Sequence, residues 1–87
     1  MKQWSIKDEI YTMIWYYESE LKEIKDKRHD AVIRFNQTKK LKEKFPELQE
    51  SLQELYNEIA VIEEELSITK SLLRRLKKIA EMYDIKY

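Results

Sequence analysis

The stretch LKEKFPEL, residues 41–48, contains the one proline of the 87-residue chain and divides it into two halves of similar length. The residue before a proline is disfavoured in the α region, and proline itself suits the first turn of a helix. Phe45-Pro46 therefore predicts the end of one helix and the start of another. We expect a single domain over residues 1–87, with helices at about 5–43 and 46–84 and a turn at about 44–46.

Signals at the outer and inner helix ends support this division. Ser5 is followed three residues later by Asp8, which fits a capping box at the start of the first helix. Lysines at 39, 40, 42 and 44 place positive charge at its C-terminal end, where the helix dipole favours cations. The polar stretch Asn36-Gln37-Thr38 is a second place where the first helix could end.

Apolar residues in both halves alternate by three and four positions, the spacing of a coiled coil. In the second half the seam positions are Leu48, Leu52, Leu55, Ile59, Ile62, Leu66, Thr69, Leu73, Leu76, Ala80 and Tyr83. In the first half they are Ile10, Ile14, Tyr17, Leu21, Ile24, Arg28, Ala31, Phe35 and Thr38. Arg28 faces the second helix from a seam position, with Glu58 or Glu65 in reach. The pattern predicts an all-α, coiled-coil-like helical hairpin.

The charge pattern predicts how the two helices are oriented. Residues 1–21, 22–44, 45–69 and 70–87 carry net charges of −2, +5, −7 and +4. An antiparallel hairpin places blocks of opposite sign side by side, whereas a parallel pair would place like beside like. We therefore expect antiparallel helices. A continuous helix that exchanges with a second chain satisfies the same rule and remains an alternative.

A second apolar stripe lies beside the seam, and a lone pair of helices cannot bury it. We expect it to join two hairpins into a four-helix-bundle homodimer. The predicted interface residues are Met13, Tyr16, Val61, Ile68, Leu72, Ile79 and Met82. The alternative occupant is a helix of a different protein.

On the opposite side, aromatic residues of the first helix face basic residues of the second. This candidate partner surface comprises Trp4, Tyr11, Trp15, Lys70, Arg74 and Lys77. Exposed aromatic and arginine side chains are typical of binding hot spots. The alternative is structural: the aliphatic stems of the basic residues cover the rings, with cation–π contacts between them.

The basic residues near the C-terminus indicate a different function, in which they contact the phosphates of DNA or RNA. The residues concerned are Lys70, Arg74, Arg75, Lys77 and Lys78. Their apolar neighbours already belong to the seam and the second stripe, so no membrane contact is expected.

Catalysis is not expected from this composition. The chain has no cysteine and no glycine, which excludes thiolate chemistry and glycine-rich phosphate loops. His29 is the one histidine, and Glu63, Glu64 and Glu65 are consecutive, so they diverge around a helix. We predict no catalytic residue, no metal ligand and no cofactor. With no leader-like or membrane-spanning apolar run, we expect a cytoplasmic setting.

The sequence thus predicts a non-enzymatic protein–protein interaction module, a small adaptor or an inhibitor and regulator. A small nucleic-acid-binding regulator is the alternative. An amino-acid composition rich in lysine, isoleucine and tyrosine is typical of proteins from AT-rich genomes, such as those of low-GC bacteria and their phages.

Overall fold

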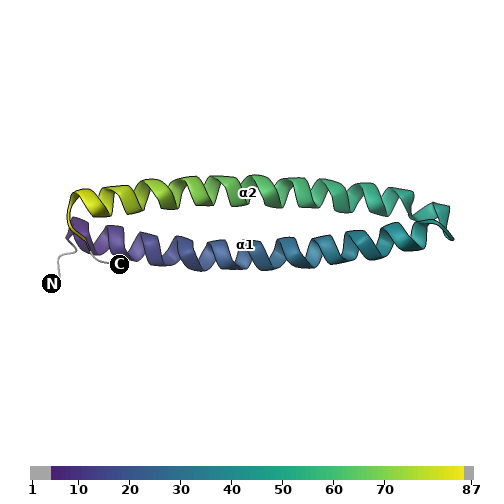
Figure 1. Ribbon diagram of the computed structural model, residues 1–87, viewed down its shortest axis with the longest axis horizontal. Helices are drawn as coiled ribbons and strands as arrows, with labels where there is room; N and C mark the ends of the chain where they lie inside the picture. Colours follow the sequence, from purple (N-terminus) through teal and green to yellow (C-terminus); the bar gives the residue numbers. More distant parts are fainter. Residues whose placement is uncertain (1–4, 86–87) are drawn as a thin grey trace.

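The computed structural model describes residues 5–85 and consists of two long helices packed antiparallel along their whole length (Figure 1). Helix α1 covers Ile6–Lys42, a short 3-10 turn η1 covers Pro46–Leu48, and helix α2 covers Gln49–Met82. The hairpin measures 62 × 26 × 15 Å. The predicted helical hairpin with antiparallel helices is confirmed. The first helix continues without a break through Asn36.

Helix α1 begins with the capping box that the sequence indicates. Ser5 is the N-cap and precedes the first helical residue. The Asp8 N–H donates to Ser5 Oγ at 3.2 Å, and the Ser5 N–H donates to Asp8 Oδ2 at 3.4 Å. These bonds satisfy donors that the first helical turn would otherwise leave unpaired.

The connection between the helices is built without glycine. The N–H groups of Lys44 and Phe45 both donate to the Leu41 carbonyl, at 3.1 and 2.9 Å. Phe45 then adopts φ −128° and ψ 82°, outside the α region that a following proline disfavours. Pro46 opens η1, and the Leu48 N–H donates to the Phe45 carbonyl at 3.0 Å. The second helix therefore starts as a 3-10 turn and becomes α-helical at Gln49.

The buried residues lie at the seam positions predicted from the sequence. One buried cluster, near the free helix ends, contains Ile10, Ile14, Leu73, Leu76 and Ala80. A second cluster, nearer the middle, contains Ile24, Ala31 and Ile62. Thr69 is also buried. These apolar contacts supply the main driving force for closing the hairpin.

The half of the hairpin near the turn is packed less tightly. No residue between positions 32 and 61 is fully buried, although this range contains six seam positions. Five of them are apolar, and all are half-buried: Phe35, Thr38, Leu48, Leu52, Leu55 and Ile59. The stability of the fold is therefore concentrated away from the turn.

The C-terminal end of α2 differs from the prediction. Tyr83 was expected to lie in the seam, but its side chain is 58% exposed. Asp84 adopts a left-handed conformation with φ 53°, and the Ile85 N–H donates to the Ala80 carbonyl at 2.8 Å. This is a Schellman motif, which ends the helix and turns the chain back. Ile85 packs against the first cluster in place of Tyr83.

Candidate binding surfaces

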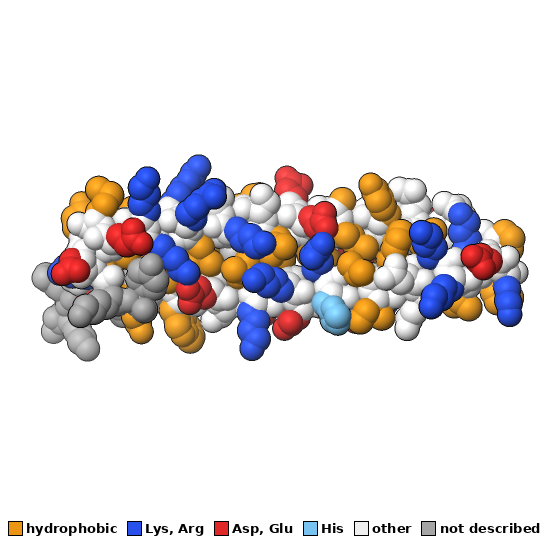
Figure 2. Space-filling view, in the orientation of Figure 1, with side chains coloured by type: hydrophobic (Ala, Val, Ile, Leu, Met, Phe, Trp, Pro, Cys, Tyr) orange, Lys and Arg blue, Asp and Glu red, His pale blue; other side chains and the backbone are white. Residues whose placement is uncertain are grey.

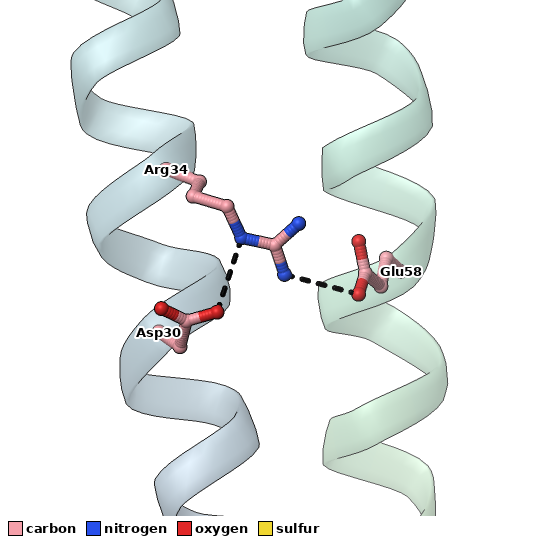
Figure 3. A network of polar contacts seen from close by, with 3 residues as sticks. All are labelled: Asp30, Arg34 and Glu58. Carbon is pink, nitrogen blue, oxygen red and sulfur yellow. Dashed lines mark hydrogen bonds and ion pairs between the residues drawn. The ribbon is translucent and has the colours of Figure 1, made fainter.

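Ion pairs between the helices define the two flanks of the hairpin. On one flank Arg34 bridges both helices (Figure 3). Its Nη2 lies 3.2 Å from Glu58 Oε1 of α2, and its Nε lies 3.2 Å from Asp30 Oδ2, one turn away on α1. We call this side the Arg34 flank.

The opposite side carries two further pairs. Arg28 Nη2 lies 3.2 Å from Glu63 Oε1, and Lys77 Nζ lies 2.9 Å from Glu18 Oε1. Glu63 and Lys77 are fourteen residues apart, so they share one stripe of α2. The five-residue step from Glu58 to Glu63 turns about 140° around the helix, which places the two glutamates on different flanks. We call the second side the Lys77 flank.

The partner of Arg28 corrects the sequence prediction. Glu58 or Glu65 was expected, but the observed partner is Glu63. Arg34 already binds Glu58, and Glu65 follows Glu58 by seven residues along the Arg34 flank. The Arg28 guanidinium instead leaves the seam toward the Lys77 flank, where Glu63 is the carboxylate within reach. Both side chains are about half exposed, so the pair contributes only about 0.2–1 kcal/mol.

The Arg34 flank carries the predicted dimer interface as an exposed apolar surface. Val61 lines a shallow hollow together with Arg34 and Glu58, and the other members lie on the same side at helical spacing. Leu72 is half-buried and the rest are exposed. We call this surface the apolar face; it comprises Met13, Tyr16, Val61, Ile68, Leu72, Ile79 and Met82.

The apolar face is large for a single small chain. Met82, Ile68 and Val61 are 75%, 62% and 58% exposed. Six of the seven residues are at least 38% exposed, so together they leave several hundred Å² of surface open. The largest apolar patch of a typical monomer covers about 300–600 Å². One partner of a standard protein interface contributes about 800 Å².

The Lys77 flank contains a groove between the two helices. Its floor is formed by Leu21 of α1 and Leu73 of α2, and its volume is about 510 Å³. We call it the basic groove; it is lined by Leu21, Lys70, Leu73, Arg74, Lys77, Lys78 and Glu81. Lys70 also lines a neighbouring hollow of about 370 Å³ with Arg28 and Glu63, so the depression extends toward the middle of the hairpin.

Basic side chains of both helices gather over this face, with apolar side chains between them (Figure 2). Lys77 is paired with Glu18. The side chains of Lys70, Arg74 and Lys78 make no ion pair or hydrogen bond with any residue of the described range 5–85. The groove therefore presents positive charge that residues 5–85 do not neutralise.

The predicted aromatic residues remain open to solvent. Trp15 is 65% exposed, and Tyr11 is also exposed. Within residues 5–85 neither ring takes part in a ring or cation–π contact, and the one aromatic pair is Tyr16 with Tyr17, edge to face at 5.1 Å. Trp4 lies outside the described residues. The structural interpretation, in which basic stems cover these rings, does not hold for Tyr11 and Trp15.

The structure separates the residues predicted for nucleic-acid contact. Lys70, Arg74, Lys77 and Lys78 surround the basic groove, whereas Arg75 does not line it. The sequence pattern also missed three members of this site. Leu21 and Leu73 were assigned to the seam alone, although their edges form the groove floor, and Glu81 carried no periodic signal.

Two other kinds of site are absent from the described part of the chain. Between residues 5 and 85 there is no group of three His, Cys, Asp or Glu side chains that could hold a metal ion. In the same range neither helix has an apolar stretch long enough to cross a bilayer.

No known protein family, no curated protein and no solved structure matches this chain.

Proposed function

We propose that this protein is a non-enzymatic protein–protein interaction module, a small adaptor or inhibitor. Two hairpins pair through the apolar face into a four-helix bundle, and a protein partner binds the flank that carries the basic groove and Trp15. The observation that carries the proposal is the exposed apolar face, because a surface of this size normally marks an interaction site.

The distribution of the apolar face favours one arrangement of the pair. Its members lie in α1 before residue 17 and in α2 after residue 60, so they are concentrated near the free helix ends. Two copies of the apolar face come into register when the twofold axis of the dimer runs parallel to the long axis of the hairpin. In that arrangement the free helix ends of both hairpins lie together. Each α1 packs against the partner's α2 in antiparallel orientation, which again sets the +5 block beside the −7 block.

Substitution of a glutamate into the apolar face tests this function. Ile68→Glu should convert the dimer to a monomer with helical content intact, because a charge cannot be buried in the bundle core without a partner. Size-exclusion chromatography with light scattering measures the mass, and circular dichroism measures the helix content.

Ile33→Glu is the matched control, since Ile33 is also exposed but does not belong to the apolar face. This variant should remain dimeric. The proposal is wrong if the unaltered protein is monomeric at about 200 μM, well above the Kd expected for an interface of standard size. Equal dissociation of the Ile33 variant would also contradict it.

A small nucleic-acid-binding regulator is the second candidate. It is supported by Lys70, Arg74 and Lys78, whose charges have no ion-pair partner within residues 5–85. This function requires affinity for an oligonucleotide that falls with salt, with a log–log slope of several units. Absence of binding at low salt excludes it.

A further inference from the structure

We propose that the basic groove binds a third helix: an acidic amphipathic helix of a protein partner. Its apolar residues contact Leu21 and Leu73, and its carboxylates pair with Lys70, Arg74 and Lys78. This inference rests on the proposed function as a protein-interaction module, and it names the chemistry of the partner.

The shape of the groove suits a helix that lies lengthwise. The groove runs between two antiparallel helices and has an apolar floor with one leucine from each side. Its basic residues from Lys70 to Lys78 span about 12 Å along α2, at a rise of 1.5 Å per residue. A docked helix presents side chains at i, i+4 and i+7 over the same length.

The charge around the groove selects an acidic partner. Lys22 and Lys25 follow Glu18 by four and seven residues, so they lie on the same stripe of α1 and add positive charge opposite α2. Near the groove, Glu18 is paired with Lys77 and Glu63 is paired with Arg28. Glu81 is the one carboxylate among the residues that line the groove. The uncompensated charge of the groove is therefore positive.

The basic groove is chemically more complementary to an amphipathic helix than to a nucleic-acid backbone. The floor of the groove is made of leucine side chains, which a phosphodiester chain cannot cover favourably. Arg75, which phosphate binding would recruit, lies outside the groove. The groove also lies on the flank opposite the apolar face, so it stays open when two hairpins pair.

A synthetic helix serves as the probe. The peptide has about 20 residues, long enough to form a helix in water, with leucine at three seam positions and glutamate on both sides of them. Fluorescence anisotropy of the labelled peptide should give a Kd on the order of 10–100 μM with the full-length chain. Two control peptides replace every glutamate by lysine or every leucine by serine, and both should bind at least about tenfold more weakly.

Variants of the protein locate the binding site. Lys70→Glu with Arg74→Glu should weaken peptide binding by roughly tenfold or more, because both rim charges are reversed. The single variant Arg74→Glu should also weaken binding several-fold, and Arg75→Glu is its matched control. Both make the same charge change on neighbouring residues of α2, but Arg75 lies outside the groove, so its variant should alter the Kd by less than about twofold. A single-stranded and a duplex oligonucleotide of about 20 nucleotides complete the set.

Three results would overturn the inference: no binding of the acidic peptide at about 200 μM protein, equal losses in the Arg74 and Arg75 variants, or tighter binding of an oligonucleotide than of the peptide. Light scattering on the same samples keeps the two proposals distinct. If the protein is a dimer that does not bind the peptide, only the proposal of helix binding in the basic groove is wrong. If it is a monomer that binds the peptide, only the proposed pairing of hairpins is wrong.

Discussion

Arg28 occupies a seam position within the second buried cluster, between Ile24 and Ala31 of the same helix. Its guanidinium leaves the seam to meet Glu63 at 3.2 Å, and Leu66 lines the same hollow. A polar residue at such a position commonly fixes the register or the oligomeric state at some cost in stability.

Arg28→Leu should therefore raise the melting temperature by several degrees. Packing leucine against Leu66 contributes about 1 kcal/mol or more, and the half-exposed ion pair that is lost contributes at most about 1 kcal/mol. The oligomer should at the same time become less well defined. Circular dichroism melting at fixed protein concentration, with light scattering, measures both effects. His29→Leu adds the same side chain at an exposed neighbour and should leave the melting temperature unchanged. A lower melting temperature with an unchanged oligomer would contradict this role for Arg28.

Asp84 is the one non-glycine residue with positive φ among residues 5–85, and it ends α2. A left-handed conformation is costly for residues with a Cβ and is easily adopted by glycine. Asp84→Gly should therefore raise the free energy of unfolding by about 0.5–1 kcal/mol, and Asp84→Ala should lower it by a similar amount. Urea titration followed by circular dichroism compares the three proteins. If glycine proves no better than alanine, the Schellman motif does not form in solution.

At the scale of the elements, the hairpin is unevenly packed. Within residues 5–85, full burial is confined to residues before 32 and after 61, although the seam spacing extends to Thr38 before the turn and resumes at Leu48 after it. Few buried apolar contacts near the turn mean a low free energy of local opening there.

Hydrogen exchange should show this difference directly. Amides of 35–58 should exchange at least about tenfold faster than amides of 10–31 and 62–80, because the turn half can open without breaking the two clusters. Mass spectrometry of the exchanging protein resolves these segments. Uniform protection along both helices would show that the half-buried seam near the turn is as stable as the clusters.

The sequence predicted the helices and their seam because periodicity and charge are properties of whole segments. It did not predict the position of Tyr83, because the apolar spacing does not show where the helix ends. The helix ends where Asp84 adopts a positive φ. Similarly, the charge blocks predict antiparallel helices, but the rotamer of Arg28 decides that Glu63 is its partner. The flank of the basic groove was predicted, whereas its leucine floor requires the actual separation of the helices.

For the whole molecule, the two flanks have different characters. The apolar face leaves several hundred Å² of surface open, and the basic groove on the other side holds uncompensated positive charge. Pairing through the apolar face would leave two basic grooves on opposite sides of a four-helix bundle. Such a dimer could engage two partner helices at once, with the gain in avidity that two linked sites give.

Small-angle X-ray scattering of the full chain tests the pairing of hairpins most directly. A side-by-side bundle has twice the chain mass of 10.8 kDa, and its length stays close to the 62 Å of one hairpin. The proposal predicts this doubled mass with a thicker cross-section and no increase in length. A mass of one chain at about 200 μM, or a particle close to twice as long, as an exchanged or end-to-end pair would give, contradicts it.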